Sequence, residues 1–205
     1  MKRGFTLIEM MVAIGIIAVL IATMIGSYSS FTHTAEKAKC RELVFQVATA
    51  LTTLYEREGN WPKILAVRGK TDGKLDADTA IALKDYYSLN VANGKLAGYD
   101  RFGIVSPWAL DVIKRGGSSV SLSTVVSTSK KGGAKTIDDH ILHFALDLDG
   151  DGIIEGAMVG GESVDVRATA IVWCAGRDGF MEPYSKGQKG DGVYSWSSGQ
   201  TKKVK

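Results

Sequence analysis

The most pronounced pattern in the chain is an apolar segment near its N-terminal end. Residues 5–26 contain a single charge, Glu9, and Lys2 and Arg3 precede them. A helix needs about 20 apolar residues to cross a bilayer, whereas the apolar part of a secretory signal peptide has about 7–15. Because positive residues stay on the cytoplasmic side, we expect the N-terminus in the cytoplasm and the rest across the membrane. The pattern predicts a membrane-spanning helix over residues 5–26.

A second periodic pattern lies between residues 36 and 58. Apolar residues recur there at intervals of three and four, which is typical of a helix with one buried face. Gly59 is a stop signal, and Pro62 follows shortly. We predict one stem helix from about Thr6 to Glu58, about 80 Å long at 1.5 Å per residue. Gly26 could supply a weak point, although a smooth helix is equally compatible. The apolar stripe consists of Leu43, Val47, Ala50, Leu51, Leu54 and Tyr55.

The rest of the chain predicts mainly strands and loops. Ile141–Leu146 and Val166–Trp173 are rich in β-branched and apolar residues and are bounded by Gly and Asp. Val120–Ser127 is a third candidate strand, and residues 77–87 contain short, weak helix signals. Residues 147–152 are typical of a hairpin turn. The predicted fold class is α+β, with a long N-terminal helix packed on a small antiparallel sheet.

Charge and motifs exclude two classes of function. The formal net charge of the 205 residues is +3, and loss of Lys2 and Arg3 would leave +3 − 2 = +1. That charge is too small and too scattered to predict a nucleic-acid partner. The chain has no nucleophile motif, no phosphate-binding Gly-rich loop after a strand, and no metal-ligand set with an open position, so we predict no enzyme.

The chain has two cysteines, Cys40 and Cys174, which lack metal-ligand spacing. Two are too few for a disulfide framework. If the domain lies outside the cytoplasm, the two could form a disulfide. We favour the simpler interpretation of two separate, partly buried thiols.

Glu9 does not fit an ordinary membrane anchor. An acidic residue near the centre of a membrane helix costs about 2.5–3.5 kcal/mol, and somewhat less near an end. Such a residue needs a partner, and the nearby cations are Lys2, Arg3 and the α-amino group of the mature chain. Alternatively, Glu9 lies near the interface and reaches water.

Residues 2–9 (KRGFTLIE) resemble the cleavage and methylation motif of type IV prepilins and type II secretion pseudopilins. The resemblance implies the pilin fold. It also implies that a prepilin peptidase cuts between Gly4 and Phe5, removes the leader 1–4 and methylates the new amine of Phe5. Glu9 would then neutralise the N-terminal amine of a neighbouring subunit during assembly.

The same resemblance implies three parts and a location. Residues 1–4 are the leader, 5–26 the transmembrane and assembly helix, and 27–205 a periplasmic pilin-like domain that includes the C-terminal half of the stem. The protein would cross the bacterial inner membrane once and assemble into a filament. Implied partners are identical subunits, other pseudopilins, the prepilin peptidase and an inner-membrane assembly platform.

Three functions remain open on the sequence. We favour a subunit of the periplasmic pseudopilus of a type II protein secretion system. The alternative is a type IV pilin of a surface fibre used for adhesion, motility or DNA uptake. A single-pass binding domain that never polymerises is the third.

The first of two acidic loops matches part of an EF-hand pattern. Gly152 stands at position 6, which that loop requires. Position 12, where a bidentate Glu belongs, is Met158. The pattern is therefore compatible with a calcium site and with an acidic turn that binds no metal. The residues at positions 1, 3, 5 and 9 are Asp147, Asp149, Asp151 and Glu155.

The second acidic loop comprises residues 174–179 (CAGRDG) and 190–196 (GDGVYSW). It resembles the C-terminal calcium-binding loop of the major pseudopilin, and the resemblance assigns Asp178 and Asp191 as calcium ligands. The family often has two consecutive acids where this chain has Gly190 before Asp191. Glu182 or backbone carbonyls would have to replace the missing carboxylate.

Overall fold

The computed structural model describes residues 6–76, 79, 82–83, 105–116, 121–129, 133–187 and 191–202. Residues 1–5, and with them the predicted cleavage site between Gly4 and Phe5, lie outside the described residues. The chain divides into two compact units, Met1–Glu36 and Lys37–Lys205. We call them the first and second unit.

Helix α1 extends from Leu7 to Glu58, close to the predicted bounds of the stem. It ends at Gly59, whose φ of 70° lies in the left-handed region that favours glycine. The Gly59 N–H donates a hydrogen bond to the Tyr55 carbonyl at 2.8 Å. In the first unit, every large apolar side chain from Leu7 to Ile21 is between 53 % and 78 % exposed. Apart from Glu9, the segment of α1 from Leu7 to Ile21 is therefore apolar on all sides.

Among the described residues, no helix is both long enough and apolar enough to span a membrane.

The second unit combines the C-terminal half of α1 with short helices and strands. The helical elements are α2 (Lys63–Arg68), α4 (Pro107–Gly116), α5 (Tyr184–Gly187) and the 3-10 helices η2 (Ile137–His140) and η3 (Ser198–Gln200). The strands are β1 (Gly73–Lys74), β2 (Val125–Ser129), β3 (Gly133–Thr136), β4 (His143–Leu146), β5 (Ile154–Val159), β6 (Glu162–Val166), β7 (Ala170–Cys174), β8 (Val193–Tyr194) and β9 (Thr201–Lys202).

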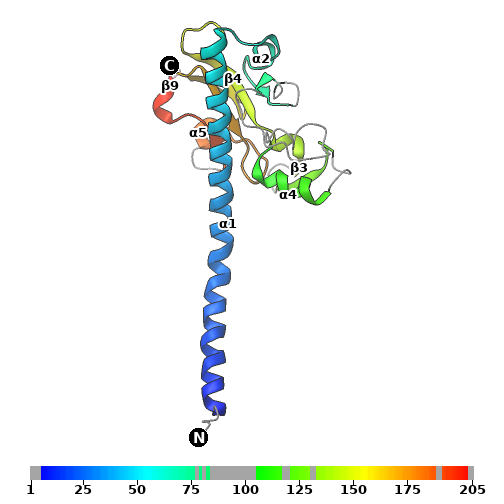
Figure 1. Ribbon diagram of the computed structural model, residues 1–205, viewed down its shortest axis with the longest axis vertical. Coiled ribbons are helices and arrows are strands. Elements are labelled where there is room, and N and C mark those ends of the chain that lie inside the picture. The colour runs from blue at the N-terminus through cyan, green and yellow to red at the C-terminus, as the bar shows by residue number, and fades with distance from the viewer. Residues whose placement is uncertain are drawn as a thin grey trace. The chain divides into compact units, whose positions relative to one another are not determined.

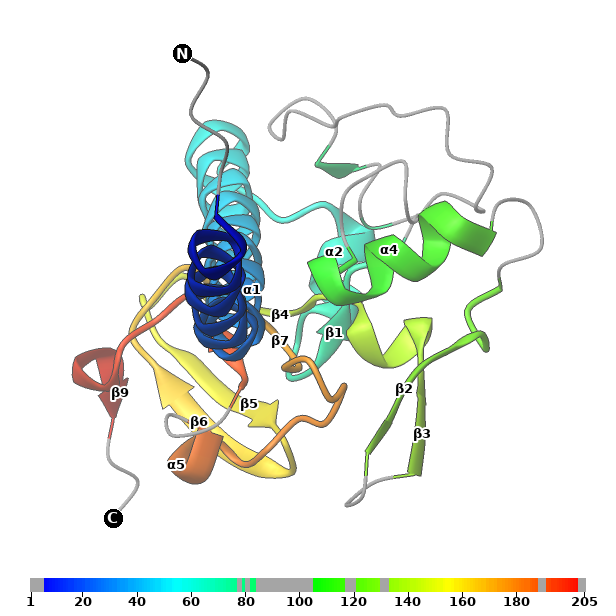
Figure 2. The ribbon, with the colours of Figure 1, turned by 90° about the horizontal axis from the view of Figure 1, so that it is seen from below.

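The strands form antiparallel sheets with the orders β1-β4-β7-β8, β2-β3 and β5-β6-β9. The first sheet lies beside the C-terminal half of α1 (Figure 1). Figure 2 shows β5 and β6 on one side of the β4–β7 pair and β2 and β3 on the other. The predicted α+β class, a long helix packed with antiparallel sheet, is confirmed, with several small sheets in place of one.

Four predicted elements differ in detail, and the first, the strand predicted from Ile141, begins only at His143. The segment Val166–Trp173 is not one strand, because β6 ends at Val166 and β7 begins at Ala170 after a bend. The prediction of a hairpin turn at 147–152 is wrong, since β4 and β5 belong to different sheets and the loop connects them. The third candidate strand starts late, at Val125, and Val120 lies outside the described residues. Most of the segment 77–87 also lies outside them.

Strand β7 is buried along its whole length because its two faces pack against different cores. Ala170, Val172 and Cys174 belong to a core that includes the buried stripe of α1. Ile171 and Trp173 point the other way, into a core with β5 and β6. Burial on both faces explains why this segment has no polar alternation in the sequence. The α1 residues in the first core are Cys40, Val44, Val47, Leu51 and Leu54.

The two cysteines lie together in the first core. Cys40 and Cys174 are each 0 % exposed, and the neighbouring Cys40 thiol helps to raise the pKa of the Cys174 thiol. The two cysteines are free thiols, as expected, but they are completely and not partly buried. The sequence did not reveal this burial because the stripe of α1 was identified from large apolar residues only, and Cys40 extends that stripe by one turn.

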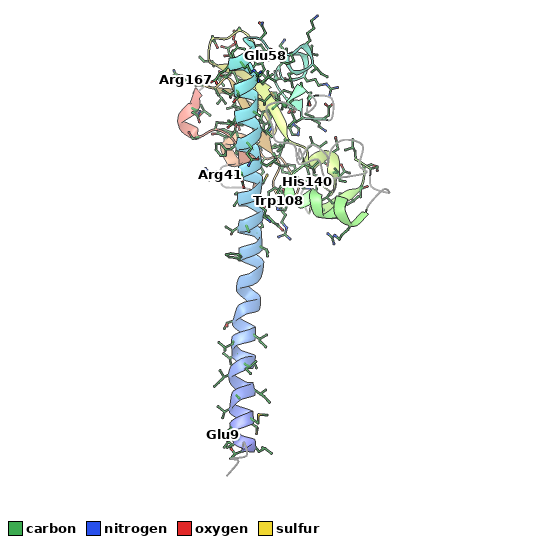
Figure 3. The ribbon with its side chains drawn as sticks, viewed as in Figure 1. Glu9, Arg41, Glu58, Trp108, His140 and Arg167 are labelled. Atoms are coloured by element: carbon green, nitrogen blue, oxygen red, sulfur yellow. The ribbon has the colours of Figure 1, made fainter. Side chains whose placement is uncertain are left out.

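A completely buried histidine, His140, links η2 to the start of α4 (Figure 3). Its Nδ1 lies 3.3 Å from Ser106 Oγ, and its carbonyl accepts a hydrogen bond from the Ser106 N–H at 3.0 Å. Burial lowers the pKa of His140, and Lys135 acts in the same direction, whereas Asp139 and Asp178 oppose it. The folded state therefore favours the neutral imidazole.

We predict that acid destabilises the fold through His140. A group whose pKa is lower when folded contributes full stability above its unfolded pKa of about 6.5 and loses it as the pH falls. The loss is at most about 1.4 kcal/mol per pH unit. Tm measured from pH 7.5 to pH 5 should fall more steeply for the wild type than for His140→Gln. Equal slopes would contradict this role.

Candidate functional site

Glu9 closes the first turn of α1 in a reciprocal hydrogen-bond pattern with Thr6 (Figure 3). The N–H and the hydroxyl of Thr6 each donate to Glu9 Oε2 at 2.8 Å. The Glu9 N–H in turn lies 3.4 Å from Thr6 Oγ1. This is a capping box, which satisfies N–H groups that a helix start leaves unpaired. Threonine followed three residues later by glutamate is a sequence signal that could have revealed this cap.

The cap places the carboxylate of Glu9 at the very start of the helix. The predicted cleavage site between Gly4 and Phe5 is one residue before Thr6 in the sequence, outside the described residues. The structure thus holds the carboxylate of Glu9 against Thr6, the first described residue. The large apolar side chains that follow, from Leu7 to Ile21, are more than half exposed in the single chain.

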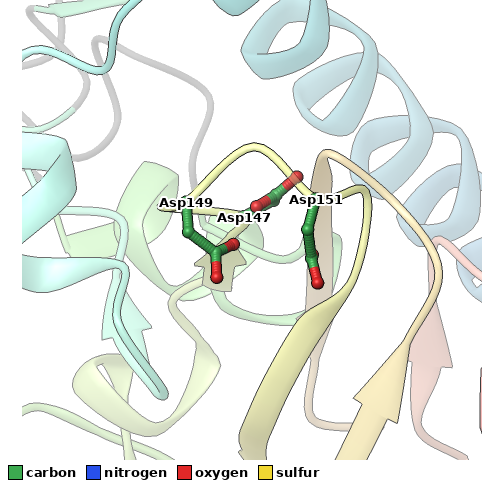
Figure 4. Close-up of side chains that lie close together, drawn as sticks. All are labelled: Asp147, Asp149 and Asp151. Atoms are coloured by element: carbon green, nitrogen blue, oxygen red, sulfur yellow. The ribbon is translucent and has the colours of Figure 1, made fainter.

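Three of the four predicted ligands in the first acidic loop lie together. The carboxylate oxygens of Asp147, Asp149 and Asp151 are all within 4.8 Å of one another, around the turn after β4 (Figure 4). Glu155 is not part of this cluster and occupies an exposed position on β5. Among the described residues, no other set of three acidic, histidine or cysteine side chains comes this close.

Hydrogen bonds and ring stacking fix the conformation of this loop. Asp147 is almost completely buried, and its two carboxylate oxygens accept hydrogen bonds from the N–H groups of Gly150 and Gly152, both at 2.8 Å. Trp61 Nε1 donates to the Asp147 carbonyl at 2.5 Å, and the Trp61 ring stacks on Tyr55 with centroids 4.7 Å apart. The end of α1 thereby holds the acidic turn in place, while Asp149 and Asp151 remain exposed.

Only some of the predicted residues of the second acidic loop lie close to one another. Gly176 faces Asp191 so closely that a Cβ on Gly176 would lie 2.1 Å from the Asp191 Cβ, so only glycine fits there. Asp178 instead accepts a hydrogen bond from the Phe180 N–H at 3.0 Å. The described residues of this loop contain no cluster of three ligands.

The end of the second loop is tied into the fold. Ser195 Oγ accepts a hydrogen bond from the Val172 N–H at 2.9 Å, and the Ser195 N–H donates to the Val172 carbonyl at 2.9 Å. Trp196 is buried and stacks on Tyr184, with centroids 5.4 Å apart. These two residues therefore hold the chain against β7.

A capped apolar helix segment leads into a second unit in which antiparallel sheets pack on the C-terminal half of α1. The family model that matches is the prokaryotic N-terminal methylation motif, over residues 1–25. This match supports the resemblance of the N-terminal segment to type IV prepilins.

Similar proteins with curated functions are found among bacterial pilins. A fimbrial protein of Neisseria meningitidis serogroup A is 31 % identical over 94 residues, which are 46 % of this chain and 52 % of that protein. The type IV major pilin protein PilE of Neisseria gonorrhoeae is 30 % identical over 94 residues, 46 % of this chain and 53 % of that pilin. The chain thus matches about half the length of these relatives. No solved structure matches it significantly.

Proposed function

We propose that this chain is a structural, non-catalytic subunit of a type IV pilus-like surface fibre, assembled through α1. The observation that carries the proposal is an N-terminal methylation motif that leads directly into a helix with an uncovered apolar surface. A helix that is apolar on all sides needs a membrane or other helices around it. The similarity to major pilins supports the fibre over the pseudopilus, which the sequence alone had favoured.

The proposal assigns a role to each part of the chain. A prepilin peptidase removes residues 1–4, and residues 5–26 anchor the subunit in the bacterial inner membrane, with the N-terminus cytoplasmic. Residues 27–205 lie on the periplasmic side until an inner-membrane assembly platform adds the subunit to the fibre. The apolar side chains then exchange lipid for the helices of identical subunits.

Glu9 gives the assembly step its specificity. Removal of residues 1–4 makes Phe5 the first residue, with a charged amine, and leaves Glu9 at the fifth position. Two unpaired charges in lipid are each costly, and pairing them recovers much of that cost. The amine of Phe5 on one subunit and the carboxylate of Glu9 on another supply that pair.

The pseudopilin of a type II secretion system remains the second candidate. The close approach of Gly176 to Asp191 supports it, because these residues match the major pseudopilin loop. Its partners would be other pseudopilins in a short periplasmic filament.

Deleting the gene in its own bacterium distinguishes the two candidates. We expect surface fibres to disappear from electron micrographs while the secreted proteins in the culture medium stay unchanged. A plasmid copy of the gene should restore the fibres. Loss of secreted proteins with intact fibres would instead assign the pseudopilus, and no change in either would refute both candidates.

We also propose that Asp147, Asp149 and Asp151 bind calcium. Calcium takes six to eight oxygen ligands, and three converging carboxylates fit this preference, with backbone carbonyls or water completing the shell. The buried Asp147 fixes the turn, so the exposed Asp149 is the residue to change. Millimolar extracellular calcium would occupy even a weak site.

The calcium proposal predicts a measurable change in Tm. At a calcium concentration about tenfold above Kd, EDTA should lower Tm by about 3–5 °C. Asp149→Asn should abolish this response, whereas Glu155→Gln, outside the cluster, should retain it. If only Asp191→Asn abolished the response, calcium would belong to the second loop. If EDTA left the wild-type Tm unchanged, neither acidic loop would be a calcium site.

A further inference from the structure

The pair of buried thiols in the first core has no role in the proposed fibre. Cys40 lies on α1 and Cys174 ends β7, separated by 174 − 40 = 134 positions in the sequence. Both are 0 % exposed and belong to the same core, and the Cys40 thiol lies near enough to help raise the pKa of the Cys174 thiol. Packing therefore makes the only two sulfhydryl groups of the chain neighbours across the interface between helix and sheet.

We propose that Cys40 and Cys174 form a disulfide that fastens α1 to the sheet of β1, β4, β7 and β8. This inference rests on the proposed function in one respect: the second unit must lie outside the cytoplasm, where disulfides persist. The structure shows the two cysteines as free thiols, which is the reduced form of the pair.

The oxidation requires a partner disulfide, such as a periplasmic thiol oxidant or oxidised glutathione. One cysteine thiolate attacks the partner disulfide and releases one partner thiol. The other cysteine then attacks the mixed disulfide and releases the second thiol. The chain loses two hydrogen atoms and two electrons, and the partner disulfide gains them as two thiols.

The timing of this reaction follows from burial. Desolvation, followed by the hydrogen bond with Cys40, raises the pKa of the Cys174 thiol well above its ordinary value. The thiolate is the reactive form, so the closed core slows both oxidation and reduction. The bond therefore forms while the helix is docking on the sheet, and once formed it is shielded from reductants.

The position of the bond suits a fibre subunit. Cys40 lies at the N-terminal end of the buried stripe of α1, close to where the second unit begins at Lys37. A covalent link there would transmit tension along α1 directly into β7 instead of through apolar contacts alone. A crosslink that closes a long loop stabilises typically by an amount that corresponds to roughly 5–15 °C in Tm.

The first experiment measures the redox state in the cell. The full chain is alkylated with N-ethylmaleimide in intact cells and again after denaturation, then extracted in detergent for intact mass spectrometry. We expect no alkylated cysteine and a mass lower by two hydrogen atoms than that of the reduced chain.

Digestion of the second unit by protease added to spheroplasts establishes its location. Two alkylated cysteines in a protease-accessible domain would overturn the disulfide and leave the proposed fibre intact, whereas a protease-protected domain would refute the proposed location.

The second experiment is independent of location. The full chain in detergent is reduced, unfolded and refolded with a mixture of reduced and oxidised glutathione. We expect a monomeric intramolecular disulfide, a Tm higher by roughly 5–15 °C than that of the reduced chain, and no effect of reductant on the double variant Cys40→Ala, Cys174→Ala. Free thiols, glutathione adducts or disulfide-linked dimers as the main product would overturn the proposal.

Discussion

Glu9→Gln is expected to abolish fibre assembly while leaving the subunit processed and in the membrane. Glutamine keeps the capping box, since it can also accept the hydrogen bonds from Thr6, but it carries no charge. The amine of Phe5 would then enter the fibre without a counter-charge. Loss of one partner of a buried ion pair costs about 3–5 kcal/mol, which lowers subunit association by about 100-fold or more.

Thr6→Ala is the matched control for that change. It removes the helix cap, at a cost of about 1 kcal/mol, but keeps the charge of Glu9. Fibres counted by electron microscopy should be absent for Glu9→Gln and present for Thr6→Ala. Immunoblots of the membrane fraction should show both variants cut to the mature length. Normal fibres from Glu9→Gln would show that the capping role, and not the charge, explains this residue.

Gly4→Val is expected to stop processing and to accumulate the full-length precursor in the membrane. A peptidase must bring its catalytic groups close to the backbone at the cut, and only glycine presents no side chain there. The retained leader keeps Lys2 and Arg3 on the cytoplasmic side and blocks the amine of Phe5, so the subunit cannot assemble.

Gly15→Ala provides a control for that variant. A Cβ at Gly15 meets nothing within 4 Å, and alanine is a better helix former than glycine. Pulse-labelled cells should convert the Gly15→Ala chain to the shorter form at the wild-type rate. The Gly4→Val chain should keep its leader throughout the chase. Cleavage of Gly4→Val at a normal rate would disprove the assigned site.

The long helix was predictable because its signals are local. Periodicity and the stop at Gly59 gave its end at Glu58, and Ser106 followed by Pro107 is a helix-start signal that could have revealed α4. The division into sheets was not predictable. Residues 167–169 bend without glycine or proline, and an acidic turn has the same local sequence whether it joins partners or separate sheets.

The candidate sites also differ in how far the sequence could predict them. The sequence identified Asp147, Asp149 and Asp151 as candidate ligands, because they alternate in one turn around glycines, and the structure brings these three together. It could not predict that Cys40 and Cys174 share a core, which depends on the register of α1 against β7. Local turns follow from local spacing, whereas contacts across a core follow from packing of the whole domain.

Whether this chain is a processed, pilin-like subunit is tested most directly by mass spectrometry of the N-terminal peptide from the membrane-bound protein. We expect this peptide to begin at Phe5 and to carry one methyl group on its α-amine. A mature chain that begins at Met1, or one cut after the apolar segment beyond residue 26, would contradict this expectation.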